Sequence, residues 1–260
     1  MPLILFRIKS FVVYWLLAVD KHSLHSPFFF DFYTTVIRPA KGKSIASAIE
    51  SLRSQLIADG RMLTITDLGA GSVKLNKAVR ISSIAKKSLT PPSFSALYGR
   101  IIEYYNAKNI VELGTSLGIN TLYLAADNTT RVTTFEGSPE VASIASLSFK
   151  FMDADNITIV VGNIDHTLPS FLQQCPKLDM VFMDANHRYK PTIQYFEWIL
   201  KKIHKRSIVI MDDIHYSPEM QQAWDTIRAY PTVYASADLF RCGLLFFDPS
   251  LNKQHVVLQF

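Results

Sequence analysis

The chain has few cysteines and no long apolar run, and both shortages limit what kind of protein it can be. Only two of its 260 residues are cysteines, Cys175 and Cys242, and their spacing fits neither a metal motif nor a redox motif. The apolar run at residues 11–19 is too short to span a bilayer, and no small-residue cleavage site follows it. We therefore expect reduced thiols, a cytoplasmic location and no transmembrane segment. The run itself predicts a buried or partner-facing helix, with a membrane-surface helix as the alternative.

Charged residues are also sparse, at 19% of the chain, whereas hydrophobic residues make up 48%. This balance predicts a large core and argues against global disorder. The formal net charge is +5, but the basic residues are scattered in short clusters. We interpret them as a solvated surface and do not expect a nucleic-acid partner.

The most informative stretch joins an expected strand at residues 109–113 to an expected helix at 121–126 through a turn framed by Gly114 and Gly118. Strand, glycine turn and helix form the nucleotide-binding corner of a doubly wound α/β sheet. The dinucleotide motif has a second glycine where this chain has Ser116, and Glu112 at the strand end would repel a pyrophosphate. A carboxylate suits a cation, so the motif favours S-adenosyl-L-methionine over NAD.

At this motif the sequence resembles the class I S-adenosylmethionine-dependent methyltransferases. Within them it is similar to the small-molecule O-methyltransferases related to the catechol and caffeoyl-CoA enzymes, and to a group of such proteins from Bacteroidetes. The resemblance covers about residues 93–247. It implies methyl transfer to a small-molecule acceptor. It also implies that Glu112 and the turn from Gly114 through Thr115 and Ser116 to Gly118 hold the methionine part of the cofactor.

Strand and helix patterns alternate after the motif. We expect four further parallel strands, at residues 131–135, 157–161, 178–183 and 207–211. The apolar stretches 232–237 and 241–247 lie too close together for a crossover helix and predict an antiparallel hairpin. The fold class is therefore α/β, a doubly wound, seven-stranded, mostly parallel sheet of Rossmann-like methyltransferase type closed by that hairpin. Residues 254–260 are a candidate for one more edge strand.

We expect two parts in the chain: an N-terminal helical cap over residues 1–92, and a cofactor-binding domain over residues 93–260. Within the cap, apolar spacing from Ile45 to Leu56 predicts a helix. The Thr90-Pro91-Pro92 run predicts a break, after which Ser93 is expected to cap a helix that ends at Tyr105.

A second strand-and-glycine pattern occurs at residues 63–72, where Asp67 precedes Gly69 and Gly71. Taken alone, it could be the cofactor motif. A basic helix is expected over residues 73–89, and no strand–helix–strand unit follows before the first motif. We therefore interpret the pattern as a structural or lid loop.

Glu136 lies 22 residues after Gly114, at the end of the next expected strand, and Gly137 follows it. An acidic residue at about this separation accepts hydrogen bonds from ribose hydroxyls, and the alternative is a solvated strand-end carboxylate. Asn163 matches the position that contacts adenine in the family, where Asp is commoner. Glu136, Gly137 and Asn163 are therefore candidate cofactor-binding residues.

Three carboxylates, Asp184, Asp212 and Asp213, end the expected strands 178–183 and 207–211. Neighbouring strand ends bring such groups together, and converging hard oxygens suit Mg²⁺ or Ca²⁺. The catechol enzymes hold a divalent metal with Asp, Asp and Asn, and Asp213 stands here in place of the Asn. Asp184 is therefore a candidate for three roles: catalysis, cofactor contact and metal ligation. The alternative is helix or loop capping without a metal.

His187 follows Asp184 by three residues, at the place where the catechol enzyme has a lysine base. An imidazole is a suitable general base near neutral pH, although a lone histidine is often structural. His215 is a second candidate.

Two other functions stay open at this point. One is RNA methylation, which the basic charge allows; against it, the Asn/Asp-Pro-Pro-aromatic motif of many amino-methylating enzymes is not found at Asp184-Ala185-Asn186-His187. The other is a non-catalytic scaffold protein that binds the cofactor. The expected partner is a small-molecule acceptor, and the oligomeric state is open, with a homodimer as one option.

Overall fold

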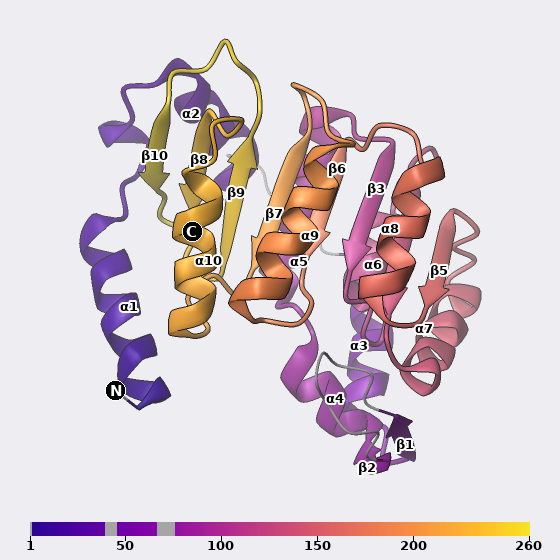
Figure 1. Ribbon diagram of the computed structural model, residues 1–260. Coiled ribbons are helices and arrows are strands. Elements are labelled where there is room, and N and C mark those ends of the chain that lie inside the picture. The colour runs from indigo at the N-terminus through magenta and orange to yellow at the C-terminus, as the bar shows by residue number, and fades with distance from the viewer. Residues whose placement is uncertain (1, 40–45, 67–75) are drawn as a thin grey trace. The chain divides into compact units, whose positions relative to one another are not determined.

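The computed structural model describes residues 2–39, 46–66 and 76–260 (Figure 1). The chain forms two compact units. Unit 1 combines Met1–Gly42 with Lys177–Phe260, and unit 2 is the continuous segment Lys43–Pro176. The expected boundary at residue 92 thus falls inside unit 2, and the N-terminal extension is divided between the two units. Its role as a cap over an acceptor pocket stays a prediction.

Unit 2 contains the expected parallel strands in the order β3-β4-β5. Helices connect and follow the strands, as in a doubly wound fold. The elements are β3 (Asn109–Leu113), α6 (Ile119–Leu124), β4 (Arg131–Glu136), α7 (Pro139–Phe151), β5 (Ile157–Val161) and α8 (Ile164–Gln174). In this register Glu112 lies opposite Thr134. The glycine turn therefore emerges at the carboxyl ends of the strands, where ligands bind in open α/β sheets.

The segment before β3 is less purely helical than expected. It contains α3 (Ser47–Ala58), β1 (Met62–Thr66), β2 (Asn76–Arg80), α4 (Ile81–Ser88) and α5 (Pro92–Tyr105). The expected basic helix over 73–89 is wrong in its first part, because residues 76–80 pair antiparallel with β1 and the helix begins only at Ile81. The strand of the second glycine pattern is present as β1, whereas Asp67, Gly69 and Gly71 lie outside the described residues.

Two local expectations in this segment have different outcomes. The apolar row of α3 is confirmed at Ile49, Leu52 and Leu56, which are buried in one cluster with side chains of α6 and α7. Ile45, the first residue of the expected row, lies outside the described residues. Ser93 is not the cap of α5, because Pro91 takes the N-cap position and Pro92 the first turn. Proline suits the first helical turn since its φ is already helical and it has no N–H to leave unpaired.

Unit 1 contains five strands in the order β10-β8-β9-β7-β6. They are β6 (Met180–Met183), β7 (Ile208–Asp212), β8 (Ala235–Asp238), β9 (Cys242–Phe246) and β10 (Gln254–Val257). β6 and β7 are parallel, and β8 and β9 form the expected antiparallel hairpin. The edge strand is also present, because β10 pairs parallel with β8. Among the described residues the main sheet strands thus number eight, where seven were expected.

The helices of unit 1 are α1 (Leu3–Leu17), η1 (Lys21–Ser23), α2 (Pro27–Phe32), the π-helical turn η2 (Tyr33–Ile37), α9 (Tyr189–Leu200) and α10 (Pro218–Arg228). Aromatic rings fill much of the core. Phe28, Phe29 and Phe32 all pack edge-on against Phe246. Gly243 lies beneath Trp224, so close that a Cβ there would fall 2.4 Å from the indole.

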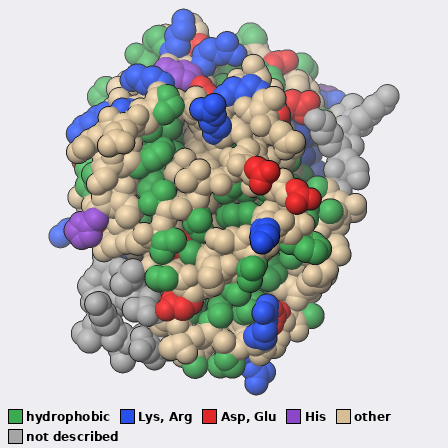
Figure 2. Space-filling model, turned by 90° about the vertical axis from the view of Figure 1, so that its right-hand side faces the viewer, with side chains coloured by type: hydrophobic (Ala, Val, Ile, Leu, Met, Phe, Trp, Pro, Cys, Tyr) green, Lys and Arg blue, Asp and Glu red, His purple; other side chains and the backbone are tan. Residues whose placement is uncertain are grey.

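The structure agrees with the expectation of an ordinary reduced interior. Cys175 and Cys242 are both buried, and neither is in a disulfide. In the part of the chain that the structure describes, no helix combines the length and apolar character needed to cross a bilayer. The face shown in Figure 2 mixes hydrophobic, basic and acidic side chains.

Candidate functional site

The glycine turn after β3 folds back over the end of β4. The backbone N–H groups of Gly114 and Thr115 both donate to the carbonyl of Phe135. Gly114, Ser116 and Gly118 have φ values of 100°, 49° and 81°, in the region that glycine adopts most easily. Ser116 is thus the one non-glycine residue that the turn holds in a left-handed conformation, which stores strain at this point.

Packing explains Gly118. A Cβ on this residue would lie 2.5 Å from the ring of Phe149, so α7 approaches the start of α6 as closely as a glycine permits. The structure therefore gives Gly118 a packing role in addition to the cofactor role that the sequence predicts.

Glu136 ends β4 directly beside the turn. Its carboxylate accepts hydrogen bonds from the backbone N–H of Ser116 at 2.9 Å and of Ser138 at 3.0 Å. Burial raises the pKa of Glu136, while these N–H groups and that of Gly137 favour the ionised form. The carboxylate is held in place at the sheet edge, as a group that accepts bonds from ribose hydroxyls must be.

Glu112 is fully buried and has its own protein partners. Its carboxylate accepts hydrogen bonds from Asn120 Nδ2, Thr121 Oγ1 and Thr134 Oγ1. Burial raises its pKa to about 7. These bonds tie β3 to α6 and β4 beneath the turn. The contact with the methionine part of the cofactor stays a prediction.

The remaining cofactor candidates also have structural partners. Thr115 is buried, and its hydroxyl lies 2.6 Å from that of Thr134. Asn163 caps α8, because its side chain accepts a hydrogen bond from the N–H of Asp165. Asn163 thus stands after β5, at the same edge of the unit 2 strands as the turn. Its contact with adenine stays a prediction.

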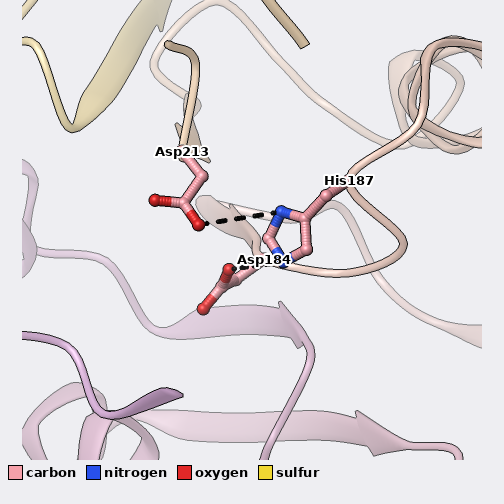
Figure 3. A group of neighbouring side chains, drawn as sticks. All are labelled: Asp184, His187 and Asp213. Atoms are coloured by element: carbon pink, nitrogen blue, oxygen red, sulfur yellow. Dashed lines mark ion pairs between the residues drawn. The ribbon is translucent and has the colours of Figure 1, made fainter. Parts of the chain in front are cut away.

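In unit 1, the ends of β6 and β7 bring Asp184, His187 and Asp213 together (Figure 3). His187 Nε2 lies 3.6 Å from Asp184 Oδ1, and His187 Nδ1 lies 3.9 Å from Asp213 Oδ2. One potential ligand atom from each residue falls within 4.8 Å of the others, and all three side chains are partly exposed. Two carboxylates and an imidazole thus converge where the sequence predicts a metal or a base.

The backbone at this cluster is strained. Asn186, His187 and Asp213 all have positive φ, at 66°, 38° and 54°. Such conformations cost about 1 kcal/mol or more for each non-glycine residue and tend to collect at functional sites. The strained residues are thus two members of the cluster, His187 and Asp213, and Asn186, which directly precedes His187.

Asp212 is not part of this cluster. Its side chain is fully buried, and its Oδ2 accepts a hydrogen bond from Arg241 Nη2 at 2.8 Å. Burial raises its pKa to about 7, against the opposing charge of Arg241. Side chains alternate in direction along a strand, so the neighbours Asp212 and Asp213 do not share one environment. The metal-ligand role of Asp212 has no support from this geometry, and His187 occupies the third place.

The cluster fits a divalent cation. One ligand atom from each of the three residues lies within 4.8 Å of the other two, near the spacing of about 3–4 Å that bond lengths of about 2.1 Å require. The two His187 distances involve different ring nitrogens, so only one of these nitrogens can face a given ion. Burial holds the pKa of His187 below its usual value, which favours the neutral imidazole that a metal or a proton can use. Mg²⁺ prefers oxygen ligands, whereas a mixed set with imidazole suits Mn²⁺ or Zn²⁺ better.

The second base candidate, His215, has a different role. Its Nε2 lies 2.7 Å from Asp238 Oδ2, and its ring stacks on Phe240. This pair joins the end of β8 to the loop after β7, and neither residue belongs to the cluster of Asp184, His187 and Asp213.

Sequence reasoning missed the groups that hold the charged residues in place. Arg241, Asn120, Thr121 and Thr134 carry no motif. Asn120 and Thr121 directly follow the glycine turn, so a search for donors near Glu112 could have found them. Arg241 depends on the pairing of β7 with β9, which local sequence does not show.

Comparison with known proteins supports the fold and the class. A family model described as a methyltransferase domain matches residues 111–214. A catechol O-methyltransferase from Niastella koreensis is 28% identical over 144 residues. The match covers 51% of this chain and spans 63% of the length of that relative.

Two solved structures illustrate the shared fold. The O-methyltransferase from Bacillus cereus in complex with SAH has a TM-score of 0.60 at 18% identity and covers 83% of this chain and 94% of its own. The O-methyltransferase TomG from Streptomyces achromogenes, in complex with SAM, has a TM-score of 0.55 at 20% identity and covers 62% and 82%.

The chain thus shares its fold with solved O-methyltransferases, and residues 111–214 match a methyltransferase domain.

Proposed function

We propose that this protein transfers the methyl group of S-adenosyl-L-methionine to a hydroxyl oxygen of a small molecule. The observation that carries the proposal is the left-handed turn from Gly114 to Gly118, with the Glu136 carboxylate fixed beside it by backbone N–H groups. A turn followed by an acidic strand end is the arrangement that binds a nucleoside in this fold class.

In this proposal unit 2 binds the cofactor. Glu136 accepts hydrogen bonds from the ribose hydroxyls, Asn163 and Gly137 line the adenine side, and the turn holds the methionine part. Glu112 supports the turn, because its three hydrogen bonds fix β3 and α6 on either side of the turn.

The cluster in unit 1 would act on the acceptor. A divalent ion held by Asp184, His187 and Asp213 would lower the pKa of a coordinated hydroxyl. Without an ion, the neutral imidazole of His187 would accept the proton, and Asp184 would stabilise the imidazolium. In both versions the acceptor oxygen becomes a better nucleophile for in-line attack on the sulfonium methyl. The curated relative makes a catechol the first acceptor to test.

Titration calorimetry with S-adenosylhomocysteine tests the cofactor site. The native protein should bind one molecule per chain, and Glu136→Ala should weaken binding about a hundredfold, since two charge-assisted hydrogen bonds are lost. Asp155→Ala, at an exposed carboxylate of the same unit, is the matched control. Tight NADH binding by the native protein would overturn the cofactor assignment.

Turnover is tested with a panel of catechols and other small hydroxyl compounds. His187→Ala should abolish methylation while leaving affinity for S-adenosylhomocysteine unchanged. Cofactor binding without methylation of any acceptor would favour the scaffold function instead.

A further inference from the structure

Helix α1 exposes an unusual amount of apolar surface. It contains ten exposed large hydrophobic side chains within 15 residues, including Ile4 at 70%, Trp15 at 68% and Leu16 at 68%. The only buried side chains of this helix are Phe6 and Ser10. Soluble monomers rarely expose a continuous apolar patch of more than a few hundred Å², and larger patches mark interaction surfaces.

The inner side of α1 is well anchored to unit 1. Arg7 Nε donates to the carbonyl of Tyr216, and its guanidinium lies 4.1 Å from the centre of the Tyr216 ring. The Tyr14 hydroxyl donates to the carbonyl of Leu258, and Phe11 packs edge-on against Phe240. Figure 1 shows α1 beside α10, with the C-terminal end of α1 toward β10. The helix is therefore fixed in position, and its outward side is a stable feature of the unit.

The exposed apolar side chains extend over about 200° of the circumference of α1, at 100° per residue. Ile4, Ile8 and Trp15 lie opposite the buried Phe6 and Ser10, with Phe11 to one side of them. Leu5, Val12 and Leu16 form a flanking row on the other side, and Val13 follows beyond the exposed Lys9. Leu17, at the end of the helix, lies on the same side as Phe6 and Ser10.

The width of this apolar surface distinguishes between two partners that could cover it, a second copy of this chain and a lipid bilayer. A partner helix from a second copy buries one stripe of about two residues in seven, which would leave the flanking rows in water. The headgroup and acyl region of a bilayer contacts every uncovered side of a helix that lies in it. At 15 residues, α1 is about 22 Å long, less than the roughly 30 Å hydrocarbon core, so it fits along the interface.

The charged residues of α1 also favour a bilayer as the partner. The cations of α1 are Arg7 and Lys9, no acidic residue lies within the helix, and Lys21 follows in η1. Lys9 is exposed at the border of the outward row, where its ammonium can reach a phosphate while the stem stays in apolar surroundings. Tyr14 and Trp15 are the aromatic types that favour membrane interfaces.

We propose that α1 docks this protein onto the surface of an anionic lipid bilayer, with Ile8, Trp15 and Leu16 inserted and Lys9 at the headgroups. The docking would place unit 1 at a membrane, where apolar acceptor molecules concentrate. It does not depend on the cofactor assignment, because α1 carries none of the residues of the proposed site.

Sedimentation with vesicles tests the proposal on the full chain. Vesicles of phosphatidylglycerol mixed in equal parts with phosphatidylcholine should carry the native protein into the pellet. Ile8→Ser with Leu16→Ser should weaken this binding by roughly a hundredfold, since two inserted side chains are lost. Lys9→Glu should weaken binding to the mixed vesicles, and added salt should weaken the native protein in the same way.

The matched control is Leu147→Ser with Phe151→Ser on α7. Leu147 and Phe151 are 58% and 66% exposed, much like Ile8 and Leu16 at 56% and 68%. This control should sediment like the native protein, and both double variants should keep the native melting temperature. Native protein that stays in the supernatant, or equal loss in both double variants, would overturn the proposal. So would a native dimer in light scattering that Ile8→Ser with Leu16→Ser dissociates, because α1 would then face a second copy.

Discussion

The carboxylate of Glu136 accepts a hydrogen bond from the backbone N–H of Ser116 at 2.9 Å. This bond joins the end of β4 to the strained middle of the glycine turn, so the two parts of the proposed cofactor site are held as one piece. Ser116 is also linked to α4, since its hydroxyl lies 2.7 Å from that of Ser88.

The Ser116 bond predicts that Glu136 stabilises the protein as well as binding the ribose. Glu136→Gln keeps one acceptor oxygen but loses the charge, so we expect about 1 kcal/mol lower stability and a smaller loss of S-adenosylhomocysteine affinity than in Glu136→Ala. Urea denaturation and calorimetry on the same samples measure both effects. Equal affinity in native protein and both variants would remove Glu136 from the site.

Gly118 should not tolerate a side chain. Gly118→Ala places a Cβ against Phe149 and requires a left-handed backbone, so we expect a loss of about 2 kcal/mol in the free energy of unfolding. The control is Gly99→Ala in α5, where nothing lies within 4 Å of the new Cβ. That change should stabilise the protein by about 0.5–1 kcal/mol, so thermal melts of the two variants should shift in opposite directions.

Glu112 should make stability depend on pH. Its folded pKa of about 7 lies above its ordinary value of 4.5, so between these values the folded state binds more protons than the unfolded state. Stability therefore falls as pH rises from about 5 to 8. In Glu112→Gln this contribution is absent. As the pH rises over that range, the free energy of unfolding of the variant should therefore increase relative to that of the native protein by up to about 3 kcal/mol. Urea denaturation at the two pH values measures the gain, and a constant difference would contradict it.

Asp212 and Arg241 should behave as a buried ion pair. Arg241→Met leaves the Asp212 carboxylate buried without its cation and should destabilise the protein by about 3 kcal/mol or more. Combining it with Asp212→Asn should restore much of the loss. If Asp212 ligated a metal instead, the double variant would lose metal binding, which calorimetry with Mn²⁺ would detect.

Metal binding should depend on Asp184 and His187. If the cluster holds an ion, Mn²⁺ should raise the melting temperature by mass action, and more than Mg²⁺ does, because the set includes an imidazole. Asp184→Asn should remove most of this gain, whereas Asp225→Asn, at an exposed carboxylate of α10, should keep it. Melting curves unchanged by millimolar Mn²⁺ would leave His187 as the base without a metal.

Local patterns predicted the strands and the turn because strand length, apolar runs and glycine spacing are properties of neighbouring residues. Thus β3 and β5 have the predicted bounds, and Glu136 ends β4 as expected. The direction of side chains at the ends of strands was harder to predict from the sequence. Asp212 and Asp213 look equivalent in sequence, yet the pairing of β7 with β9 puts Asp212 beside Arg241. The pairing of β1 with β2 was missed because Asn76–Arg80 has only two apolar residues and shows no clear strand pattern of its own.

The tie between the two ends of unit 1 bears on the order in which the chain folds during synthesis. Val19 bridges to Leu258, and Val19 N–H donates to the Val257 carbonyl. Unit 2 is continuous and can complete its contacts while the ribosome is still making β8. Residues 2–39, by contrast, must wait for the last strand, and the side of α1 that packs on unit 1 is uncovered in the meantime. Nascent chains stalled after residue 230 should therefore resist protease over unit 2 and be cut before residue 39, and early protection of α1 would contradict this order.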